Sequence, residues 1–166
     1  MGKTITYREL DILSAQFASY LQNHTNLKAG DRIALQMPNI IQYPVALFGA
    51  IRAGLIVVNT NPLYSERELK HQLNDSGAKA LIVLANVAEA AAAVVPETPV
   101  ETVIVTEIAD LHTGFKRPLI NVVVKRVKKM VPDFSFKNQI SYRKALSLGK
   151  NGKYTPSAPG AEDVAL

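Results

Sequence analysis

The chain has 166 residues, of which 48% are apolar, which is enough for one domain with a hydrophobic core and excludes disorder along its whole length. It contains no cysteine, which excludes disulfides, thiolate metal sites, iron–sulfur clusters and a cysteine nucleophile. Its three histidines show no HxxxH spacing, which excludes a histidine metal pair within one helix. No apolar run is long enough to cross a bilayer, and the start of the chain predicts no signal peptide.

The net charge of +5 is concentrated in one short segment. Residues 115–131 carry six basic residues and no acidic residue, which leaves 13 basic and 14 acidic residues in the rest of the chain. The residues between these cations are valine, isoleucine, leucine and methionine rather than aromatic stacking residues. We therefore expect no nucleic-acid partner.

Helix and strand signals alternate along the first 110 residues. A capping box that begins at Thr6 predicts a helix from about Tyr7. The expected elements that follow are a strand at 32–37, a helix from a cap at Asn39 to Gly54, a strand at 55–59, a helix from a capping box at Ser65 to Gly77, a strand at 79–84, an alanine-rich helix at 86–95 and a strand at 102–106.

The pattern favours an α/β fold in which a parallel sheet has helices on both faces. Each connection between strands is long enough for a helix, and the strands are apolar on both sides. We divide the chain into a βαβ parallel-sheet core (1–110), a basic amphipathic insertion (111–132), a short helical segment (133–148) and a linker (149–166). The linker is rich in small and polar residues, and its last six residues look like the start of a strand, so the chain is expected to be the front part of a longer protein.

No catalytic or metal-binding residue can be assigned from the sequence. The glycine patterns GxxxxGK[ST], GxGxxG and GxSxG are all absent. Glu66 and Glu68 lie two residues apart, so on a helix they point to different sides and are typical of a solvated capping turn. A lone helical histidine such as His71 is more often structural than functional.

Asn59, Thr60 and Asn61 are the candidates for a substrate crevice. They follow a predicted parallel strand, and open sheets place their ligand crevices at the carboxyl ends of such strands. The alternative is that these side chains only hydrogen-bond the turn, which Pro62 fixes. The segment 37–39 ends the preceding strand and has the same two interpretations.

Lys125, Arg126, Lys128 and Lys129 are the candidates for contact with a membrane surface. On a helical wheel the three lysines face away from a broad valine-rich arc, and Arg126 lies at the border. Such a helix can lie in the interface of an anionic membrane, where each cation contributes about 1 kcal/mol. The alternative is that its apolar face packs on its own domain or on a second subunit.

Several segments resemble one family when they are taken together. Residues 5–10 (ITYREL) and 51–64 (IRAGLIVVNTNPLY) resemble the first two core motifs of the AMP-forming acyl-CoA ligases, the adenylate-forming superfamily. Similarity to the bacterial long-chain fatty-acid–CoA ligases in particular is found at residues 37–39, 43–50, 67–73, 116–120 and 128–132.

The resemblance implies a two-step reaction in the parent enzyme. Fatty acid and ATP with magnesium would give an acyl-adenylate and pyrophosphate, and coenzyme A would then displace AMP. The family's phosphate-binding loop, nucleotide contacts and adenylating lysine have no counterpart in the chain. It therefore resembles an amino-terminal fragment that is expected to be inactive alone and to hold no cofactor, because stabilising a transferring nucleotide requires such groups.

The resemblance also implies partners and a location. The expected partners are the remainder of the parent ligase and its substrates, in the cytoplasm or at the inner face of the membrane. A freestanding lipid-surface or protein-interaction module on the same fold remains the alternative function. An open sheet edge would further predict association between copies of the chain.

Overall fold

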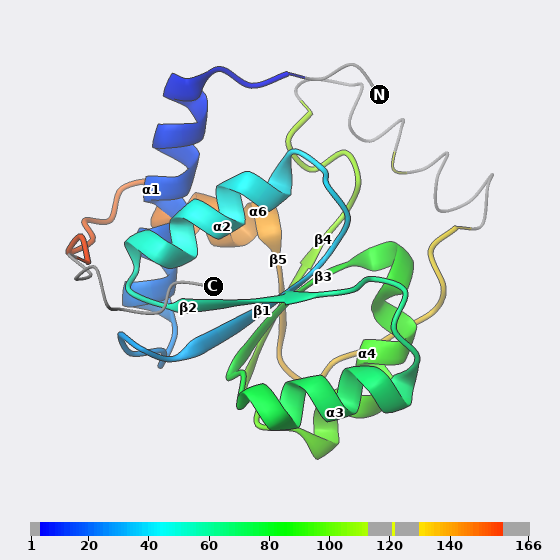
Figure 1. The fold of residues 1–166 in the computed structure, drawn as a ribbon. Coiled ribbons are helices and arrows are strands. Elements are labelled where there is room, and N and C mark those ends of the chain that lie inside the picture. Colours follow the sequence, from blue (N-terminus) through cyan, green and yellow to red (C-terminus); the bar gives the residue numbers. More distant parts are fainter. Residues whose placement is uncertain (1–3, 113–120, 122–129, 158–166) are drawn as a thin grey trace.

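The computed structural model describes residues 4–112, 121 and 130–157, which form one parallel sheet between two layers of helices (Figure 1). The order in the sheet is β2-β1-β3-β4-β5, and every neighbouring pair is parallel. The strands are β1 (Arg32–Gln36), β2 (Ile56–Thr60), β3 (Ala80–Leu84), β4 (Thr102–Thr106) and β5 (Gln139–Ser141). The predicted α/β fold with a parallel sheet is confirmed.

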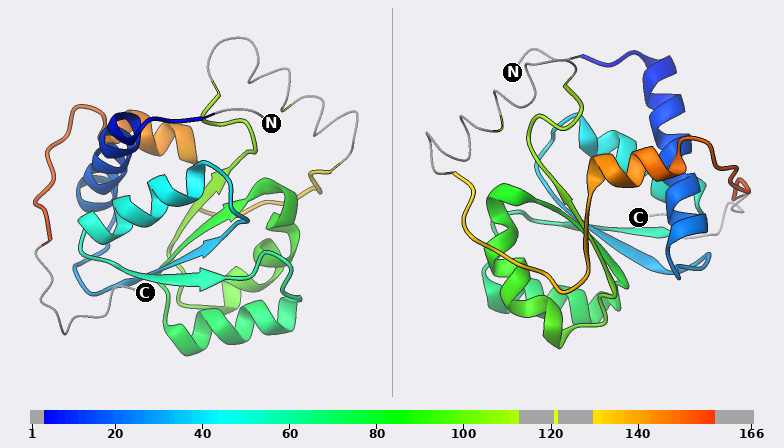
Figure 2. Two further views of the ribbon diagram at one scale, coloured as in Figure 1. Left: turned by 45° about the horizontal axis from the view of Figure 1, so that its top comes forward. Right: turned by 180° about the vertical axis from the view of Figure 1, so that it is seen from behind.

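Helices cover both faces of the sheet, as Figures 1 and 2 show. One face carries α1 (Tyr7–His24), α2 (Gln42–Arg52) and α6 (Tyr142–Gly149). The other face carries α3 (Glu66–Ser76) and α4 (Ala88–Val94), and short 3-10 turns at Ala85–Val87 and Val95–Glu97 flank α4.

The sheet separates two hydrophobic cores because alternate residues of a strand point to opposite faces. In β1, Ile33 and Leu35 are buried against α1 and α2, whereas Ala34 belongs to the core under α3 and α4. All five residues of β3 are buried. This strand lies in the middle of the sheet, which explains why its sequence is apolar without alternation.

Both predicted capping boxes are present. The Thr6 hydroxyl accepts a hydrogen bond from the Glu9 amide (3.1 Å), and the Glu9 carboxylate accepts one from the Thr6 amide (2.7 Å). Ser65 and Glu68 make the same reciprocal pair at the start of α3. The helix ends at Gly77, which has the left-handed φ of 64° that glycine adopts without strain.

The predicted cap at Asn39 is wrong. Helix α2 begins at Gln42, and the residue before it makes no side-chain capping bond. A tight turn, in which the Ile40 amide bonds the Pro38 carbonyl (2.7 Å), occupies the intervening residues. Pro44 then lies in the first turn of α2, where a missing amide costs little.

The sequence analysis also missed β5. Its three residues pair in parallel with β4, and Ile140 lies beside Ile104. Three residues are too few to show an alternating pattern, so only the helix after them was expected. That helix, α6, begins one residue after Ser141, whose hydroxyl accepts a hydrogen bond from the Lys144 amide (3.3 Å).

Residues 149–157 are the described part of the predicted linker. Of these, Gly149 is the last residue of α6, and residues 153–157 are hydrogen-bonded to α1 and α2. Gln22 of α1 both donates to the Thr155 carbonyl and accepts from the Thr155 amide, each at 2.9 Å. Asn23 donates to the carbonyl of Lys153 (2.8 Å). Polar side chains of a distant helix hold this segment, which its own composition could not reveal. The four-segment division of the chain stays a prediction.

Helix α1 packs closely against both α2 and α6, and glycine makes each approach possible. A Cβ atom on Gly49 of α2 would lie 2.8 Å from the ring of Phe17. A Cβ atom on Gly149, the last residue of α6, would lie 1.9 Å from the backbone oxygen of Gln16. The second contact joins backbone to backbone, so no change of rotamer could accommodate a side chain there.

Candidate functional site

Asn59 lies near the carboxyl end of β2, the edge strand, and its polar groups are engaged locally. Its side-chain oxygen accepts a hydrogen bond from the Tyr43 hydroxyl (2.8 Å), and its backbone carbonyl accepts one from the Gln72 amide group (3.0 Å). These contacts connect β2 to the start of α2 and to α3. The predicted crevice residue therefore joins three elements at the edge of the sheet.

Thr60 and Asn61 also have partners within their own segment. Thr60 is buried, and its hydroxyl donates to the Val58 carbonyl (3.2 Å). The Asn61 side chain accepts from the Leu63 amide (2.9 Å), which is the local bond of an Asx turn. Such local bonds are what we expect if these side chains only stabilise the turn. Substrate contact by Asn59, Thr60 and Asn61 stays a prediction.

Gln36, the last residue of β1, is a polar residue that sequence reasoning overlooked. It is fully buried, and within the described part of the chain neither polar atom of its side chain has a hydrogen-bond partner. Leaving such a group unpaired costs about 1–3 kcal/mol, so a bound water or other polar group would stabilise it. The sequence did offer one signal for it, because Gln36 is the single glutamine at the end of an apolar strand.

Lys125, Arg126, Lys128 and Lys129 lie outside the described residues, so membrane contact by them stays a prediction. On either side of this stretch the chain is attached to the core. Asn121 accepts from the Ala109 amide (3.2 Å), and Asn86 donates to the carbonyl of Met130 (2.9 Å).

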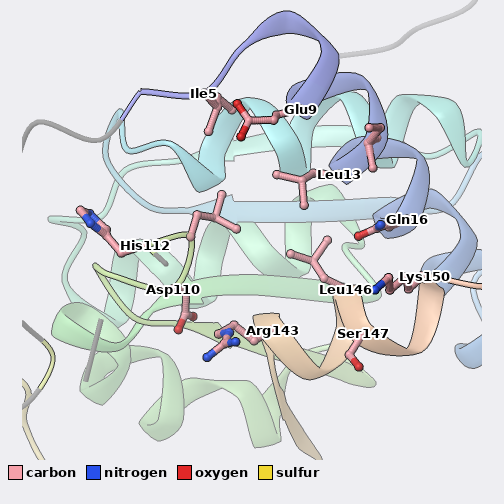
Figure 3. Close-up of a pocket in the computed structure, with 12 residues that line it drawn as sticks. Ile5, Glu9, Leu13, Gln16, Asp110, His112, Arg143, Leu146, Ser147 and Lys150 are labelled. Atoms are coloured by element: carbon pink, nitrogen blue, oxygen red, sulfur yellow. The ribbon is translucent and has the colours of Figure 1, made fainter. Parts of the chain in front are cut away.

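A cavity of about 410 Å³ lies between α1, α6 and the loop that follows β4 (Figure 3). A stripe of α1, together with Ile5 ahead of the helix, faces a stripe of α6, and residues 110–112 close one end. The apolar lining residues are Ile5, Ile12, Leu13, Leu111 and Leu146. A volume of this size is within the range that small-molecule sites occupy.

Asp110 is the buried charged group of this cavity. Its carboxylate accepts hydrogen bonds from the Glu107 amide (2.8 Å) and the Thr106 hydroxyl (3.2 Å), while only 6% of the residue is exposed. Burial raises the pKa of the Asp110 carboxyl above its ordinary value, and the positive charge of Arg143 opposes this rise. A buried carboxyl in a cavity marks a candidate site.

A second polar connection holds the loop beneath the cavity. The buried side chain of Gln42 donates to the Glu107 carbonyl (2.8 Å), and the Tyr142 hydroxyl donates to the Gln42 carbonyl (3.4 Å). Burial, together with the nearby charge of Asp110, raises the pKa of Tyr142 well above its ordinary value. Tyr142 therefore stays protonated and acts as a donor that joins α6 to α2.

The described residues offer neither a metal cluster nor a membrane-spanning helix. No three histidine, aspartate or glutamate residues among them are grouped in a way that could hold a metal ion. In the same part of the chain, no helix combines the length and apolarity needed to span a bilayer.

Comparisons with known proteins give a consistent result over the whole chain. A family model described as "AMP-binding enzyme" matches residues 1–166. Long-chain-fatty-acid–CoA ligases from Salmonella typhimurium and Escherichia coli O157:H7 are 50% and 49% identical over 166 residues. The match covers 100% of this chain and 30% of each ligase, so the chain spans less than a third of their length.

Solved structures show the same fold at low sequence identity. The A domain of carboxylic acid reductase from Segniliparus rugosus matches with a TM-score of 0.73 at 20% identity, over 97% of this chain and 25% of that one. A long-chain-fatty-acid-CoA ligase from Archaeoglobus fulgidus matches with a TM-score of 0.71 at 22% identity, over 99% of this chain and 27% of that one.

Asp110→Asn should increase the free energy of unfolding at pH 7. Because the folded-state pKa of Asp110 is raised, the folded protein binds its proton more tightly than the unfolded chain. The stabilisation that follows is present below the ordinary pKa of 3.8 and is lost as the pH rises through the folded-state pKa. Urea unfolding of both proteins should therefore show a difference at pH 7 that shrinks at pH 4.

Asp133→Asn is the matched control, because Asp133 is exposed and lies in a loop. It should change the free energy of unfolding by no more than about 0.5 kcal/mol at either pH. A destabilised Asp110→Asn at pH 7 would show that the carboxylate gains more from its hydrogen bonds than it loses by burial.

Proposed function

Because the chain belongs to the family of AMP-binding enzymes, we propose that it forms part of a ligase that converts long-chain fatty acids to acyl-CoA through an acyl-adenylate. The observation that carries this proposal is the identity of about half of all residues with curated long-chain-fatty-acid–CoA ligases along the entire chain. The shared parallel-sheet fold of a ligase and of a reductase A domain supports it.

The residues of this chain do not fit the nucleotide or magnesium that such a reaction uses. Its sequence has no glycine-rich phosphate loop, and the described residues hold no cluster of metal ligands. Stabilising the charge on a transferring nucleotide needs preorganised amides, cations and metal. We therefore propose that ATP, magnesium and coenzyme A are bound by regions that correspond to the remaining length of the relatives.

The chain's own contribution is structural in this proposal. Among the described residues, a five-stranded sheet and two layers of helices enclose two hydrophobic cores. Such a unit can support catalytic groups that come from elsewhere in a longer enzyme, and the remainder of that enzyme is its main partner.

A hybrid enzyme tests the proposal directly. Residues 1–166 would replace the matching region of the Escherichia coli O157:H7 ligase, to which the chain is 49% identical. We expect the hybrid to form acyl-CoA from palmitate, ATP and coenzyme A within about tenfold of the parental kcat/KM, because core substitutions that keep volume and pattern are tolerated. Residues 1–166 alone should release no pyrophosphate.

Two results would contradict the proposal. Pyrophosphate release by the isolated chain, dependent on fatty acid, would show that catalytic groups lie within it. A hybrid that folds, as judged by its unfolding transition, but forms no acyl-CoA would show that the similarity does not extend to this function. The parental ligase carried through the same purification is the control.

We also propose that the basic segment contacts an anionic membrane surface. The support is the charge of +6 on residues 115–131, beside a valine-rich sequence. In the hybrid ligase, replacing Lys125, Lys128 and Lys129 by glutamate should reduce sedimentation with phosphatidylglycerol vesicles at least tenfold, because three attractive charges become repulsive. Unchanged sedimentation would contradict the proposal and would indicate that the segment packs on protein instead. Lys137→Glu, outside the segment, is the control for the effect of a changed net charge.

A further inference from the structure

We propose that the cavity between α1 and α6 is a docking site for an amphipathic helix from the remaining length of the ligase. This helix carries acidic residues beside its apolar stripe. The inference rests on the proposed function, because it takes the chain as part of a longer enzyme. It follows from the length, the exposed apolar surface, the polar groups and the charge of the cavity in Figure 3.

Two helical stripes of equal length form the long sides of the cavity. The stripe on α1 runs from Glu9 to Gln16, and the stripe on α6 and its C-terminal cap runs from Arg143 to Lys150. The ends of each stripe are seven residues apart, which is about 10 Å or two helical turns. A helix that docks in such a space uses apolar anchors at positions i, i+3 or i+4 and i+7, which span the same length.

The apolar residues of the cavity leave surface exposed that a partner would cover. Leu13 of α1 and Leu146 of α6 line opposite sides, as Figure 3 shows, and Ile12 beside them is 48% exposed. Exposed apolar patches mark interaction surfaces, and about 25 cal/mol is gained for each Å² that is buried. The chain spans 30% of each matched ligase, so most of such an enzyme lies outside it and can supply the covering segment.

The polar groups of the cavity favour a helix over an extended segment. An extended segment presents backbone amides and carbonyls along its whole length, and each of them needs a partner when it is buried. Apart from His112 and the charged groups, the polar side chains that line the cavity are those of Gln16 and Ser147. A helix pairs its backbone groups internally, so it needs only the side-chain contacts that the cavity offers.

The basic groups of the cavity favour acidic residues on that helix. Within the described ranges neither Arg143 nor Lys150 makes a hydrogen bond or an ion pair, although Arg143 acts on Asp110 at longer range. Residues 134–157 carry five basic residues and no acidic residue, so the α6 side of the cavity is positive. A guanidinium and an ammonium beside an apolar surface are complementary to carboxylates at the edge of an apolar stripe.

The acidic groups of the cavity are already engaged within the protein. The Glu9 carboxylate accepts hydrogen bonds from the amide and the hydroxyl of Thr6. The Asp110 carboxylate accepts from the Glu107 amide and the Thr106 hydroxyl and is buried. Neither group is arranged to attract a basic helix, so the charge of the partner follows from Arg143.

Photocrosslinking in the hybrid ligase that carries residues 1–166 tests this surface. The photoreactive amino acid p-benzoylphenylalanine replaces Ile12, and mass spectrometry identifies the segment that it captures. We expect a segment of the parental part of the hybrid, with apolar residues at i, i+3 or i+4 and i+7 and an excess of aspartate and glutamate beside them. In addition, acetylation of Lys150 by a water-soluble reagent should be about tenfold slower in the hybrid than in isolated residues 1–166.

A charge reversal and its matched control test the contribution of the basic groups. Arg143→Glu with Lys150→Glu should lower the crosslinking yield at least tenfold, because like charges would then face each other. Lys144→Glu with Lys153→Glu makes the same change of net charge at exposed positions that do not line the cavity, and it should leave the yield within about twofold. The unfolding transitions of both variants establish that they are folded.

Several outcomes would overturn the inference. These are crosslinks confined to residues 1–166, capture of a segment without an acidic excess, a yield that the charge reversal leaves unchanged, and equal reactivity of Lys150 in the hybrid and in the isolated chain. Capture of a second hybrid molecule or of a lipid would also overturn it and would assign the cavity to that occupant. None of these measurements requires turnover. A folded but inactive hybrid with the expected crosslink would contradict the proposed function alone, and an active hybrid without it would contradict this inference alone.

Discussion

The structure depends on a backbone contact between the first and the last helix of the described chain. Gly149 brings the end of α6 so close to α1 that a Cβ atom would lie 1.9 Å from the oxygen of Gln16. Strand β5 has only three residues and pairs with a single neighbour, so it cannot be stable by itself. Packing of α6 on α1 stabilises β5. In this packing the rings of Phe17 and Tyr142 are in contact, with 5.2 Å between their centroids.

The same contact shapes the cavity. The helices meet at Gly149 and Gln16, and the stripes that begin at Ile5 and Arg143 leave a space between them. The loop after β4 closes this space, held by Gln42 and by the bonds to Asp110. The cavity thus lies between two helices on one face of the sheet, next to the loop that leaves the carboxyl end of β4.

Local signals predicted much of the fold, and long-range contacts account for what was missed. Capping boxes at Thr6 and Ser65 and the apolar runs of β1 to β4 predicted most of the first 110 residues, because their patterns span whole elements. Strand β5, the anchoring of Thr155 and the burial of Asp110 depend on partners far along the chain. For the candidate site, the sequence offered Asn59, Thr60 and Asn61 because they follow a predicted strand, and substrate contact by them stays a prediction. The cavity itself was not predicted, because the residues that line it come from α1, α6 and residues 110–112, which are far apart in the sequence.

The central claim is that the Gly149 contact holds β5 and α6 on the rest of the molecule, and amide hydrogen exchange of Gly149→Ala tests it most directly. The account predicts that residues 139–149 exchange much faster in this variant, at least tenfold, while β1 and β3 keep their protection, because a side chain at position 149 separates two backbones. Lys144→Ala, an exposed change in the same helix, should leave the exchange pattern unchanged. Equal protection of residues 139–149 in Gly149→Ala and the unmodified protein would contradict the account.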